Sequence, residues 1–309
     1  MLLSIVIPIM NEEGNIELVT AKIIEVIEKI SDYEYELIFV DDGSTDNSLL
    51  LLKKLHAHNK KIKYISFSRN FGHQNALKAG LDYAQGDCVI SMDGDMQHPP
   101  ELIPAMIAKW RKDGYDIVYT VRKDDPKLGY FKKISSYLFY KFMNLFSDIN
   151  IEPGSADFRL LNKTVVQVIK QLHENPLFFR GIIPWVGFKQ CAIEYVPNER
   201  FWGASKYSLK KMMNFAITGI SSFSIKPLML SAYCGFFISL TAFCYGLYAI
   251  FTKIFTDTVI SGWTSTLVIV SFIGGIQLIV MGIIGIYLGK LFMEFKGRPE
   301  YIIREKSDE

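Results

Sequence analysis

Two long stretches without a charged residue constrain this chain more than any other feature. They run over Leu228–Thr252, 25 residues, and Val259–Gly289, 31 residues. About 20 apolar residues, each rising 1.5 Å along a helix, cover a hydrocarbon core of roughly 30 Å. Each stretch is therefore long enough to cross a membrane, and the alternative is a helix buried in a soluble core. Gly282 and Gly285 in the second stretch would let helices pack closely, which indicates helix pairing or a homo-oligomer through the membrane helices.

The charges next to these stretches predict how they are oriented. Basic residues stand before the first stretch and after the second, while only Lys253 and Asp257 lie between them. The flanking basic residues are Lys206, Lys210, Lys211, Lys226, Lys290, Lys296 and Arg298. Residues 1–8 are apolar but lack a basic region and are not expected to form a signal peptide. By the positive-inside rule we expect a cell membrane protein (inner or plasma membrane) with two spans, both termini and the active site being cytoplasmic.

The composition of the 309 residues excludes several classes of protein. The formal net charge of +2 argues against nucleic acid as a partner. Aromatic residues make up 14% of the chain, which provides enough apolar surface for folding rather than disorder. The cysteines form no CxxC pair and indicate free thiols in a reducing compartment. They are Cys88, Cys191, Cys234 and Cys244.

Short apolar runs rich in β-branched residues alternate with helical patterns over the first 120 residues. This alternation predicts βαβ units and a mostly parallel sheet, an α/β fold with helices on both faces. The expected strands are Leu3–Pro8, Tyr35–Val40, Lys63–Phe67, Asp87–Met92 and Asp116–Thr120, and the expected helices include Ile16–Ile30 and Ser48–His56. Ligands of such sheets bind beyond the carboxyl ends of the strands, so the residues there are the first candidates for a site.

An Asp-Gly-Asp pattern follows the fourth expected strand at Asp93, Gly94 and Asp95. Residues i and i+2 of an extended chain share a face, so both carboxylates can address one hard cation such as Mg²⁺ or Mn²⁺. Gln97 can add an amide oxygen, and Gly94 permits a tight turn. Two carboxylates in a loop can also be merely solvated or cap a helix. No GxGxxG follows the first strand and no GxxxxGK[ST] occurs, which removes the main support for a dehydrogenase or a P-loop NTPase.

Two other polar segments allow more than one interpretation. Asp41–Asp46 is typical of a turn that caps the following helix, yet Asp41 at a strand end can also bind a base or a ribose hydroxyl. The basic residues of Arg69–Lys78 form either a solvated helix face or a cluster that faces a phosphate or a base.

Taken together, these segments resemble the inverting family 2 glycosyltransferases of GT-A fold, a Rossmann-like α/β fold. More narrowly, the chain looks like the polyprenyl-phosphate glycosyltransferases, the group that contains bactoprenol glucosyltransferase and dolichyl-phosphate mannose synthase. The segments that carry the resemblance are VIPIMNEEGNI at 6–16, FVDDGSTDNS at 39–48, FSRNFGHQNALKAGLDYAQGD at 67–87, MDGDMQHPPELIP at 92–104, SADFRLLNK at 155–163, FFRGIIPWVGF at 178–188 and ERFWGASKYSLKKM at 199–212. The resemblance runs from Ser4 to the end of the chain and includes the two spans.

The resemblance implies a UDP-sugar donor and a set of residues that bind it. The implied nucleotide-sugar-binding residues are Pro8, Asn11, Glu12, Asp41, Arg69, Lys78 and Asp93. A divalent cation, Mg²⁺ or Mn²⁺, would be held by Asp93, Asp95 and Gln97, and would stabilise the leaving diphosphate. The implied catalytic residues are Asp95 and Asp157. Asp157 stands where the family has a catalytic or acceptor-orienting carboxylate, and the alternative is a loop residue paired with Arg159.

The implied acceptor is a polyprenyl phosphate in the membrane. A phosphate monoester has a second pKa of about 6, so it is largely ionised at neutral pH and needs Asp157 to orient it more than to deprotonate it. The residues expected to bind the lipid phosphate or the donor phosphate are Arg122, Lys132, Arg200, Ser205 and Lys206. Phe131–Phe146 and Tyr207–Ile225 mix aromatic and aliphatic residues with lysine, as amphipathic interfacial helices do, and helices that pack between domains are the alternative.

The expected reaction transfers one hexose, with glucose as the first choice, from a UDP-sugar to undecaprenyl phosphate with inversion. The lipid-linked sugar would serve glycan modification outside the cytoplasm. Processive family 2 synthases carry QxxRW, and FRGIIPW at 179–185 stands in its place, so we expect a single transfer rather than polymerisation. The alternatives are GDP-mannose or a UDP-4-amino-4-deoxy-arabinose donor, or a non-catalytic membrane partner in lipid-sugar translocation. The expected organisation is a catalytic domain over 1–206, a juxtamembrane helix over 207–226, two membrane helices within 227–292 and a cytoplasmic tail over 293–309.

Overall fold

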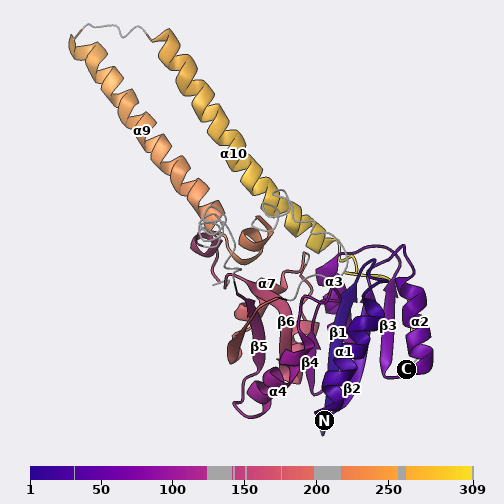
Figure 1. The fold of residues 1–309 in the computed structure, drawn as a ribbon. Coiled ribbons are helices and arrows are strands. Elements are labelled where there is room, and N and C mark those ends of the chain that lie inside the picture. Colours follow the sequence, from indigo (N-terminus) through magenta and orange to yellow (C-terminus); the bar gives the residue numbers. More distant parts are fainter. Residues whose placement is uncertain are drawn as a thin grey trace.

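An eight-stranded sheet with the order β7-β5-β6-β4-β1-β2-β3-β8 forms the centre of the N-terminal domain (Figure 1). The computed structural model describes residues 1–30, 32–123, 141, 143–149, 152–174, 176–197, 217–256 and 262–307. The strands are β1 Leu2–Ile9, β2 Glu34–Asp41, β3 Ile62–Phe67, β4 Cys88–Ser91, β5 Ile117–Arg122, β6 Ser155–Asn162, β7 Gln190–Tyr195 and β8 Ile303–Lys306. The five strands expected from the sequence are confirmed as β1 to β5, with ends that differ by no more than two residues.

The middle of the sheet is parallel and its flanks are mixed. Strands β4, β1, β2 and β3 run parallel, whereas β6 pairs antiparallel with both β4 and β5, and β8 pairs antiparallel with β3. Every residue of β1 from Leu3 to Ile9 is buried, so this strand is covered on both faces. Such unbroken apolar runs are typical of central parallel strands, since helices cover both sides of the sheet.

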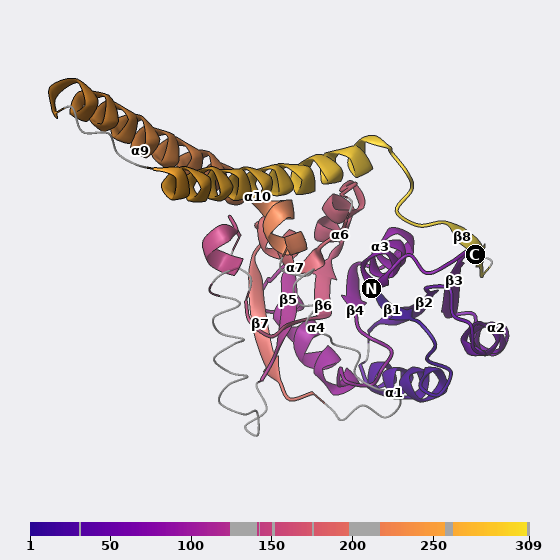
Figure 2. The same cartoon turned by 90° about the horizontal axis from the view of Figure 1, so that it is seen from above.

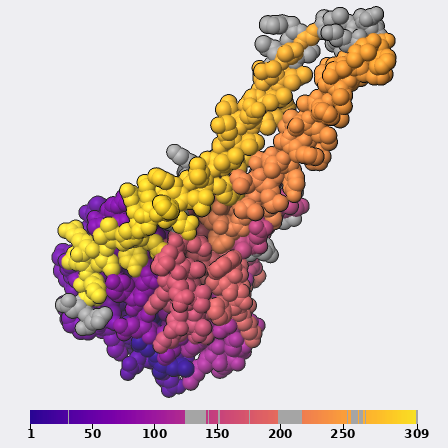
Figure 3. Space-filling view, turned by 180° about the vertical axis from the view of Figure 1, so that it is seen from behind, coloured from indigo at the N-terminus to yellow at the C-terminus, as the bar shows by residue number. Residues whose placement is uncertain are grey.

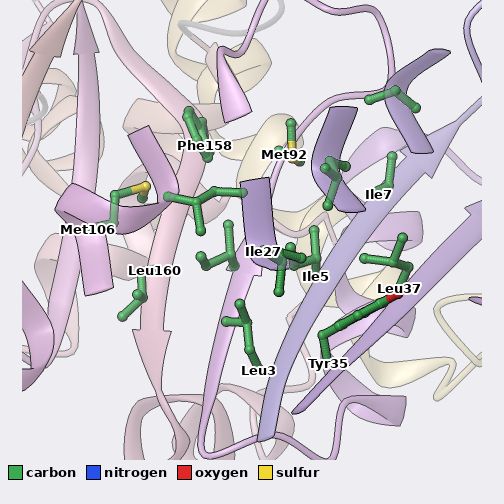
Figure 4. Close-up of a cluster of buried hydrophobic side chains, with 14 of the residues drawn as sticks. Leu3, Ile5, Ile7, Ile27, Tyr35, Leu37, Met92, Met106, Phe158 and Leu160 are labelled. Atoms are coloured by element: carbon green, nitrogen blue, oxygen red, sulfur yellow. The ribbon is translucent and has the colours of Figure 1, made fainter. Parts of the chain in front are cut away.

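Helices cover both faces of the sheet, as the α/β pattern predicts (Figure 2). The helices of this domain are α1 Ile16–Glu28, α2 Ser48–His58, α3 His73–Tyr83, α4 Ile103–Arg111, α6 Lys163–Lys170 and α7 Phe179–Trp185. Helices α1, α2 and α4 pack on one face around Leu3, Ile5 and Leu37 (Figure 4). Helices α3, α6 and α7 pack on the other face around Val6 and Ile38. Successive strand residues thus enter opposite cores.

Two long helices extend away from this domain, α9 at Lys226–Thr256 and α10 at Trp263–Phe295 (Figure 3). The segments Lys226–Thr252 and Val268–Phe295 are long and apolar enough to cross a membrane, and no residue of their most apolar windows is buried in the protein. Large apolar side chains such as Phe236 and Leu278 are more than 60% exposed. A helix buried in a soluble core is therefore ruled out for both, which supports association with a membrane.

The chain returns from α10 to the sheet. Strand β8 adds antiparallel to β3 at the edge of the sheet, and Tyr301 just before it stacks on Phe67 with ring centroids 5.1 Å apart. The Tyr301 hydroxyl also donates a hydrogen bond of 2.9 Å to Asp82 of α3. No strand pattern marks this segment in the sequence, where it was expected only as a tail. The structure shows that it ties the end of the second apolar helix to the far edge of the N-terminal domain.

The two expected interfacial helices lie largely outside the described residues. Of Phe131–Phe146, the structure describes residues 141 and 143–146, and of Tyr207–Ile225 it describes 217–225. The described parts are helical at 143–146 and 217–223, and Phe223 packs against Phe178 with ring centroids 6.0 Å apart. These turns lie where α9 leaves the domain, and their amphipathic role stays a prediction.

Candidate active site

A cleft of about 370 Å³ opens at the carboxyl ends of β1 and β4. The strand order reverses between these two strands, because β1 connects onward to β2 and β3 on one side while β4 lies on the other. Open α/β sheets bind their ligands at such a point. The residues that line the cleft are Pro8, Ile9, Met10, Glu12, Asp42, Asn70, Gly72, His73, Ala76, Asp93, Gly94, Asp95 and Asp157.

The loop that carries Asp93 and Asp95 (the aspartate loop) is fixed by contacts with His98. The backbone N–H of Asp93 donates to Nδ1 of His98 at 2.9 Å, and the His98 ring, 2% exposed, stacks on Phe158 at a centroid distance of 5.2 Å. Because Nδ1 accepts, the ring proton sits on Nε2, which faces Oδ2 of Asp93 at 3.7 Å. The loop needs a glycine between its two aspartates, since a Cβ at Gly94 would lie 2.9 Å from the Ile9 side chain.

The Asp93 carboxylate has the features of a cation ligand. Its Oδ1 is buried and has no hydrogen-bond partner among the described residues, although Nε2 of His73 lies 3.4 Å away. Asp95, also buried, accepts a hydrogen bond from the backbone N–H of Gln97 at 3.1 Å. Within the described part of the chain, no cluster of three or more His, Cys, Asp or Glu side chains is arranged to hold a metal. Two carboxylates alone fit a cation that takes its other ligands from a substrate and from water.

Three cations surround the Asp157 carboxylate. Oδ1 lies 2.8 Å from Nη2 of Arg159, and Oδ2 lies 3.7 Å from both Nε2 of His73 and Nη2 of Arg180. Burial works in the opposite direction, but Arg180, His73 and Arg159 hold the pKa of Asp157 well below its usual range. Asp157 is therefore an anion at any pH at which the protein works, and a weak proton acceptor.

His73 lies between the aspartate loop and Asp157 of β6. Its side chain lies between Asp93 and Asp157, and although burial opposes the charge, these carboxylates raise the pKa of His73 to about 9. A protonated imidazole thus bridges the aspartate loop and the Asp157 strand. His73 was not among the site residues expected from the sequence. The signal for it in the sequence was the basic segment Arg69–Lys78, and the structure places His73 of this segment at the cleft.

The structure brings only some of the expected nucleotide-binding residues to the cleft. Pro8, Glu12 and Asp93 line it, but Asp41 does not. The Asp41 carboxylate is 1% exposed and accepts hydrogen bonds from the Ser44 backbone at 3.0 Å and the Ser66 hydroxyl at 2.8 Å. Asp41 therefore makes the contacts expected of the alternative interpretation, in which Asp41–Asp46 forms a turn before the following helix.

Asp42 lines the cleft in place of Asp41, and this neighbour was missed in the sequence. Its carboxylate accepts hydrogen bonds from the backbone N–H groups of Phe71 at 2.6 Å and Gly72 at 3.0 Å. Adjacent residues at a strand end point to opposite sides, so the sequence pattern Asp-Asp alone does not tell which of the two faces the ligand.

Two other expected nucleotide-binding residues, Asn11 and Arg69, are not part of the cleft lining. Asn11, with φ of 56°, accepts a hydrogen bond from the Thr45 backbone at 2.8 Å and so fixes the loop next to Glu12. The Arg69 guanidinium lies 4.6 Å from the centroid of the Phe71 ring and is not part of the cleft lining. Their binding roles stay predictions.

Lys78 lies on the other side of α3. It follows His73 by five residues, which places it about 140° further around the helix. Its side chain is 3% exposed and forms an ion pair of 2.7 Å with Asp82, one turn later. Its Nζ also donates to the Lys170 carbonyl of α6 at 3.3 Å, so the structure places Lys78 between α3 and α6 and outside the cleft lining.

Of the residues expected to bind phosphate, the structure describes Arg122. Its Nη2 donates to Oε1 of Gln97 at 3.0 Å, which joins the end of β5 to the aspartate loop and occupies the amide oxygen expected as a cation ligand. Lys132, Arg200, Ser205 and Lys206 lie outside the described residues.

Comparison with known proteins identifies the class to which this cleft belongs. The family model described as glycosyl transferase family 2 matches residues 4–169, more than half of the chain. The chain therefore belongs to glycosyl transferase family 2, and its sheet is the GT-A type of α/β fold. It is a glycosyltransferase.

The sequence relatives indicate a narrower group within this family. The chain is 44% identical over 302 residues to "Uncharacterized glycosyltransferase YkcC" of Bacillus subtilis (strain 168), covering 98% of this chain and 93% of the relative. It is 40% identical over 306 residues to the bactoprenol glucosyl transferase of Shigella phage SfX, covering 99% of this chain and 100% of the relative. Among solved structures, the mannosyltransferase PcManGT from Pyrobaculum calidifontis is similar with a TM-score of 0.49 and 15% identity, over 71% of this chain and 61% of that one. The expected resemblance to bactoprenol glucosyl transferases is confirmed by the sequence relatives.

Proposed function

We propose that the protein transfers a single glucose from UDP-glucose to a polyprenyl phosphate, with inversion at the anomeric carbon. The observation that carries this proposal is the similarity to the bactoprenol glucosyl transferase of Shigella phage SfX, which covers 99% of the chain. It therefore includes both the cleft and the two apolar helices. A shared membrane part matters because a polyprenyl acceptor keeps its chain in the bilayer, so an enzyme that uses it must work at the membrane surface.

A divalent cation, Mg²⁺ or Mn²⁺, belongs to this proposal. Asp93 and Asp95 would hold it, supported by the buried Oδ1 of Asp93 that no described residue hydrogen-bonds. Carboxylate oxygens are the ligands that hard cations prefer. When bound, the cation supplies positive charge to the diphosphate that leaves the sugar. Gln97 would join the ligand set by exchanging its hydrogen bond with Arg122 for the cation.

Asp157 would orient the acceptor and balance charge rather than remove a proton. Three cations lower its pKa, which makes its carboxylate a poor base. The acceptor phosphate has little need of a base because its second pKa is about 6. The negative charges of the substrates and of Asp157 would together balance the positive charges of Arg159, Arg180 and His73.

The orientation in the membrane is proposed from charge. Lys226 begins α9 and Lys296 follows α10, so the ends of both helices nearest the catalytic domain are basic. The positive-inside rule then places the catalytic domain and both termini in the cytoplasm. The lipid-linked glucose would form on the cytoplasmic leaflet and serve a reaction on the other side of the membrane.

The test is a donor panel with purified protein in nanodiscs that contain undecaprenyl phosphate. We expect a lipid-linked sugar from UDP-glucose, and transfer only from GDP-mannose or UDP-4-amino-4-deoxy-arabinose would replace the donor in the proposal. Absence of transfer from every nucleotide sugar would refute the enzymatic proposal and leave a non-catalytic membrane partner.

The cation assignment is tested in the same assay by Asp95→Asn, with Asp113→Asn as the matched control. Asp113 forms an exposed ion pair with Lys109 at 3.1 Å, far from the cleft. We expect Asp95→Asn to lose transfer and the cation dependence of UDP binding, while Asp113→Asn keeps both. Normal turnover of Asp95→Asn would remove Asp95 from the cation site.

A further inference from the structure

The chain after α10 reaches further than the edge strand β8 alone. This returning segment, residues 298–307, runs from the end of α10 past α3 to the edge of the sheet (Figure 2). The carbonyl of Ile302 accepts a hydrogen bond of 3.0 Å from the backbone N–H of Ser68, one residue beyond the end of β3. Ser68 begins the loop Ser68–Gly72, which connects β3 to α3. The returning segment is therefore bonded to the start of this loop.

The loop Ser68–Gly72 and the first turn of α3 form one wall of the cleft. The residues of this wall that line the cleft are Asn70, Gly72, His73 and Ala76. Asp42 lines the cleft as well, and its carboxylate accepts from the backbone N–H groups of Phe71 and Gly72. The backbone of the wall and the Asp42 side chain are thus bonded to each other. A shift of the wall would move both relative to a ligand in the cleft.

Tyr301 contacts the strand that precedes this wall. Its ring stacks on Phe67 with the two planes 13° apart, and the Phe67 ring packs edge-on against Phe71 at a centroid distance of 5.7 Å. Phe67 is buried, with 2% of its surface exposed. Protein interiors are closely packed, so the loss of one ring lets the neighbouring rings shift. A shift of Phe71 would move the backbone N–H that it donates to Asp42.

Tyr301 also contacts the helix that follows the wall. Its hydroxyl donates to Oδ2 of Asp82 at 2.9 Å, while Oδ1 of Asp82 pairs with Lys78 at 2.7 Å. Hydrogen bonds to a carboxylate are stronger than those between neutral groups. One side chain thus contacts β3 before the wall and α3 after it. These two contacts fix the elements between which Ser68–Gly72 runs.

We propose that Tyr301 is a positioning residue for nucleotide binding, which keeps the wall of Ser68–Gly72 and the start of α3 in the geometry that the nucleotide sugar needs. It acts through the rings of Phe67 and Phe71 on one side and through Asp82 of α3 on the other. The inference rests on the proposed function, because the ligand of the cleft is the UDP-sugar proposed above. It makes donor binding depend on a residue that follows Asp82 by 219 positions in the chain.

The proposal requires that docking of the returning segment and binding of the nucleotide strengthen each other. If the wall is in place in only a fraction of the molecules, the apparent affinity falls in proportion to that fraction. By thermodynamic linkage, a bound nucleotide must then stabilise the docked segment by the factor by which docking raises the affinity. The backbone N–H of Ser307, which donates to the Tyr64 carbonyl at 2.9 Å, reports this docking.

The first experiment compares Tyr301→Leu and Tyr301→Phe with the control Tyr35→Leu. Tyr35 is also a buried tyrosine, but it lies at the amino end of β2, roughly 20 Å along the strand from Asp42. Calorimetry in the presence of Mg²⁺ measures the Kd for UDP, and the nanodisc assay measures both KM values. We expect Tyr301→Leu to raise the Kd for UDP and the KM for UDP-glucose about fivefold or more, because an aromatic stack and a hydrogen bond to a carboxylate are lost.

The other readouts separate positioning from a general loss of stability. The KM for undecaprenyl phosphate should stay unchanged in Tyr301→Leu, and Tyr301→Phe, which keeps the stack on Phe67, should recover part of the loss. Tyr35→Leu should bind UDP like the unaltered protein, although it also removes a buried ring. An unchanged Kd for UDP in Tyr301→Leu, or an equal loss in Tyr35→Leu, would overturn the positioning role.

The second experiment measures hydrogen exchange of the Ser307 N–H in the full-length protein with and without saturating UDP. We expect UDP to slow this exchange about fivefold or more, the reciprocal of the effect on affinity. Unchanged exchange would overturn the coupling. Neither binding nor exchange needs turnover, so the outcomes are distinct from those of the proposed function. Glucose transfer with an unchanged Kd in Tyr301→Leu would refute the positioning role alone, whereas Tyr301-dependent UDP binding without any sugar transfer would support it and refute the transfer reaction.

Discussion

Replacing Asp157 with asparagine removes a negative charge that faces three neighbouring cations, Arg159, Arg180 and His73. The closest contact is the 2.8 Å ion pair with Arg159, and both partners are buried, with side-chain exposures of 9% and 1%. Asparagine has nearly the same shape and keeps one oxygen that can accept from the Arg159 guanidinium. The substitution therefore keeps the shape of the side chain but removes its charge and turns an amide N–H₂ toward His73 and Arg180 in place of Oδ2.

The size of the effect follows from the burial of Arg159. Removing one partner of a buried ion pair typically destabilises a protein by about 3–5 kcal/mol. Because asparagine retains an acceptor, we expect the lower end of that range, about 3 kcal/mol. For a domain of roughly 200 residues, each kcal/mol shifts the melting temperature by about 2–4 °C, so Asp157→Asn should lower it by about 6–12 °C.

The assay is thermal unfolding of the purified protein, followed by near-ultraviolet circular dichroism, which reports the packing of the catalytic domain. Asp157→Asn, Arg159→Met and the double variant form a cycle, and Asp113→Asn, which breaks an exposed pair, is the control. The double variant should lose less stability than the two single variants lose together, since it no longer contains an unpaired buried cation. Strict additivity, or a melting temperature for Asp157→Asn equal to that of the control, would refute the reasoning.

Four further predictions concern the loop, the tail and pH. Gly94→Ala should lower transfer at least tenfold, measured in the nanodisc assay, because the added Cβ would lie 2.9 Å from the Ile9 side chain and displace the aspartate loop. Tyr301→Ala should lower stability by about 2 kcal/mol, seen as faster hydrogen exchange in β3 and β8, since it removes the stack on Phe67 and a hydrogen bond to a carboxylate; unchanged exchange would contradict a docked tail. The pKa of His73 is raised to about 9, so its contribution to the stability of the cation-free protein should be complete below its unfolded pKa of about 6.5 and disappear as the pH rises through 9. Thermal melts of His73→Gln should not show this loss of stability at alkaline pH. The rate of transfer should fall as pH drops through about 6, the second pKa of the acceptor phosphate, and a limb near 4 instead would indicate an ordinary carboxylate base.

The central strands and the aspartate loop could be predicted because local sequence decides them. Buried runs such as Leu3–Pro8, in which Ser4 is the one polar residue, need cover on both faces of the sheet and so predict a central strand. Asp93 and Asp95 follow such a run, and the structure places both residues in the lining of the cleft. Strand β8 lacks this signal, because an edge strand has one exposed face and its residues Ile303–Lys306 alternate between half-buried and exposed.

The side of an element that faces the ligand was harder to predict than the element itself. Asp41 and Asp42 differ by one residue and therefore point in opposite directions, and only the packing of Ser66 against Asp41 decides which one is structural. His73 and Lys78 share one short helix, yet they lie about 140° apart around it, so Lys78 pairs with Asp82 of the same helix and faces away from the cleft. In both cases a near neighbour of the expected residue lines the cleft, since the pattern locates the segment and the packing decides which of its residues faces the cleft.

The cluster around Asp157 explains why a site for anions contains a buried carboxylate. In the proposed reaction UDP-glucose and a lipid phosphate together bring about four negative charges, which cations such as Arg159, Arg180 and His73 would balance. Buried cations without a counter-charge would unfold the empty protein, and Asp157 provides that charge at distances of 2.8 to 3.7 Å. A bound phosphate would supply part of this negative charge. The cations would then keep a counter-charge even where their contacts with Asp157 are loosened. The same arrangement that keeps the empty site folded lowers the pKa of Asp157, which supports the proposed orienting role of this carboxylate over a role as proton acceptor.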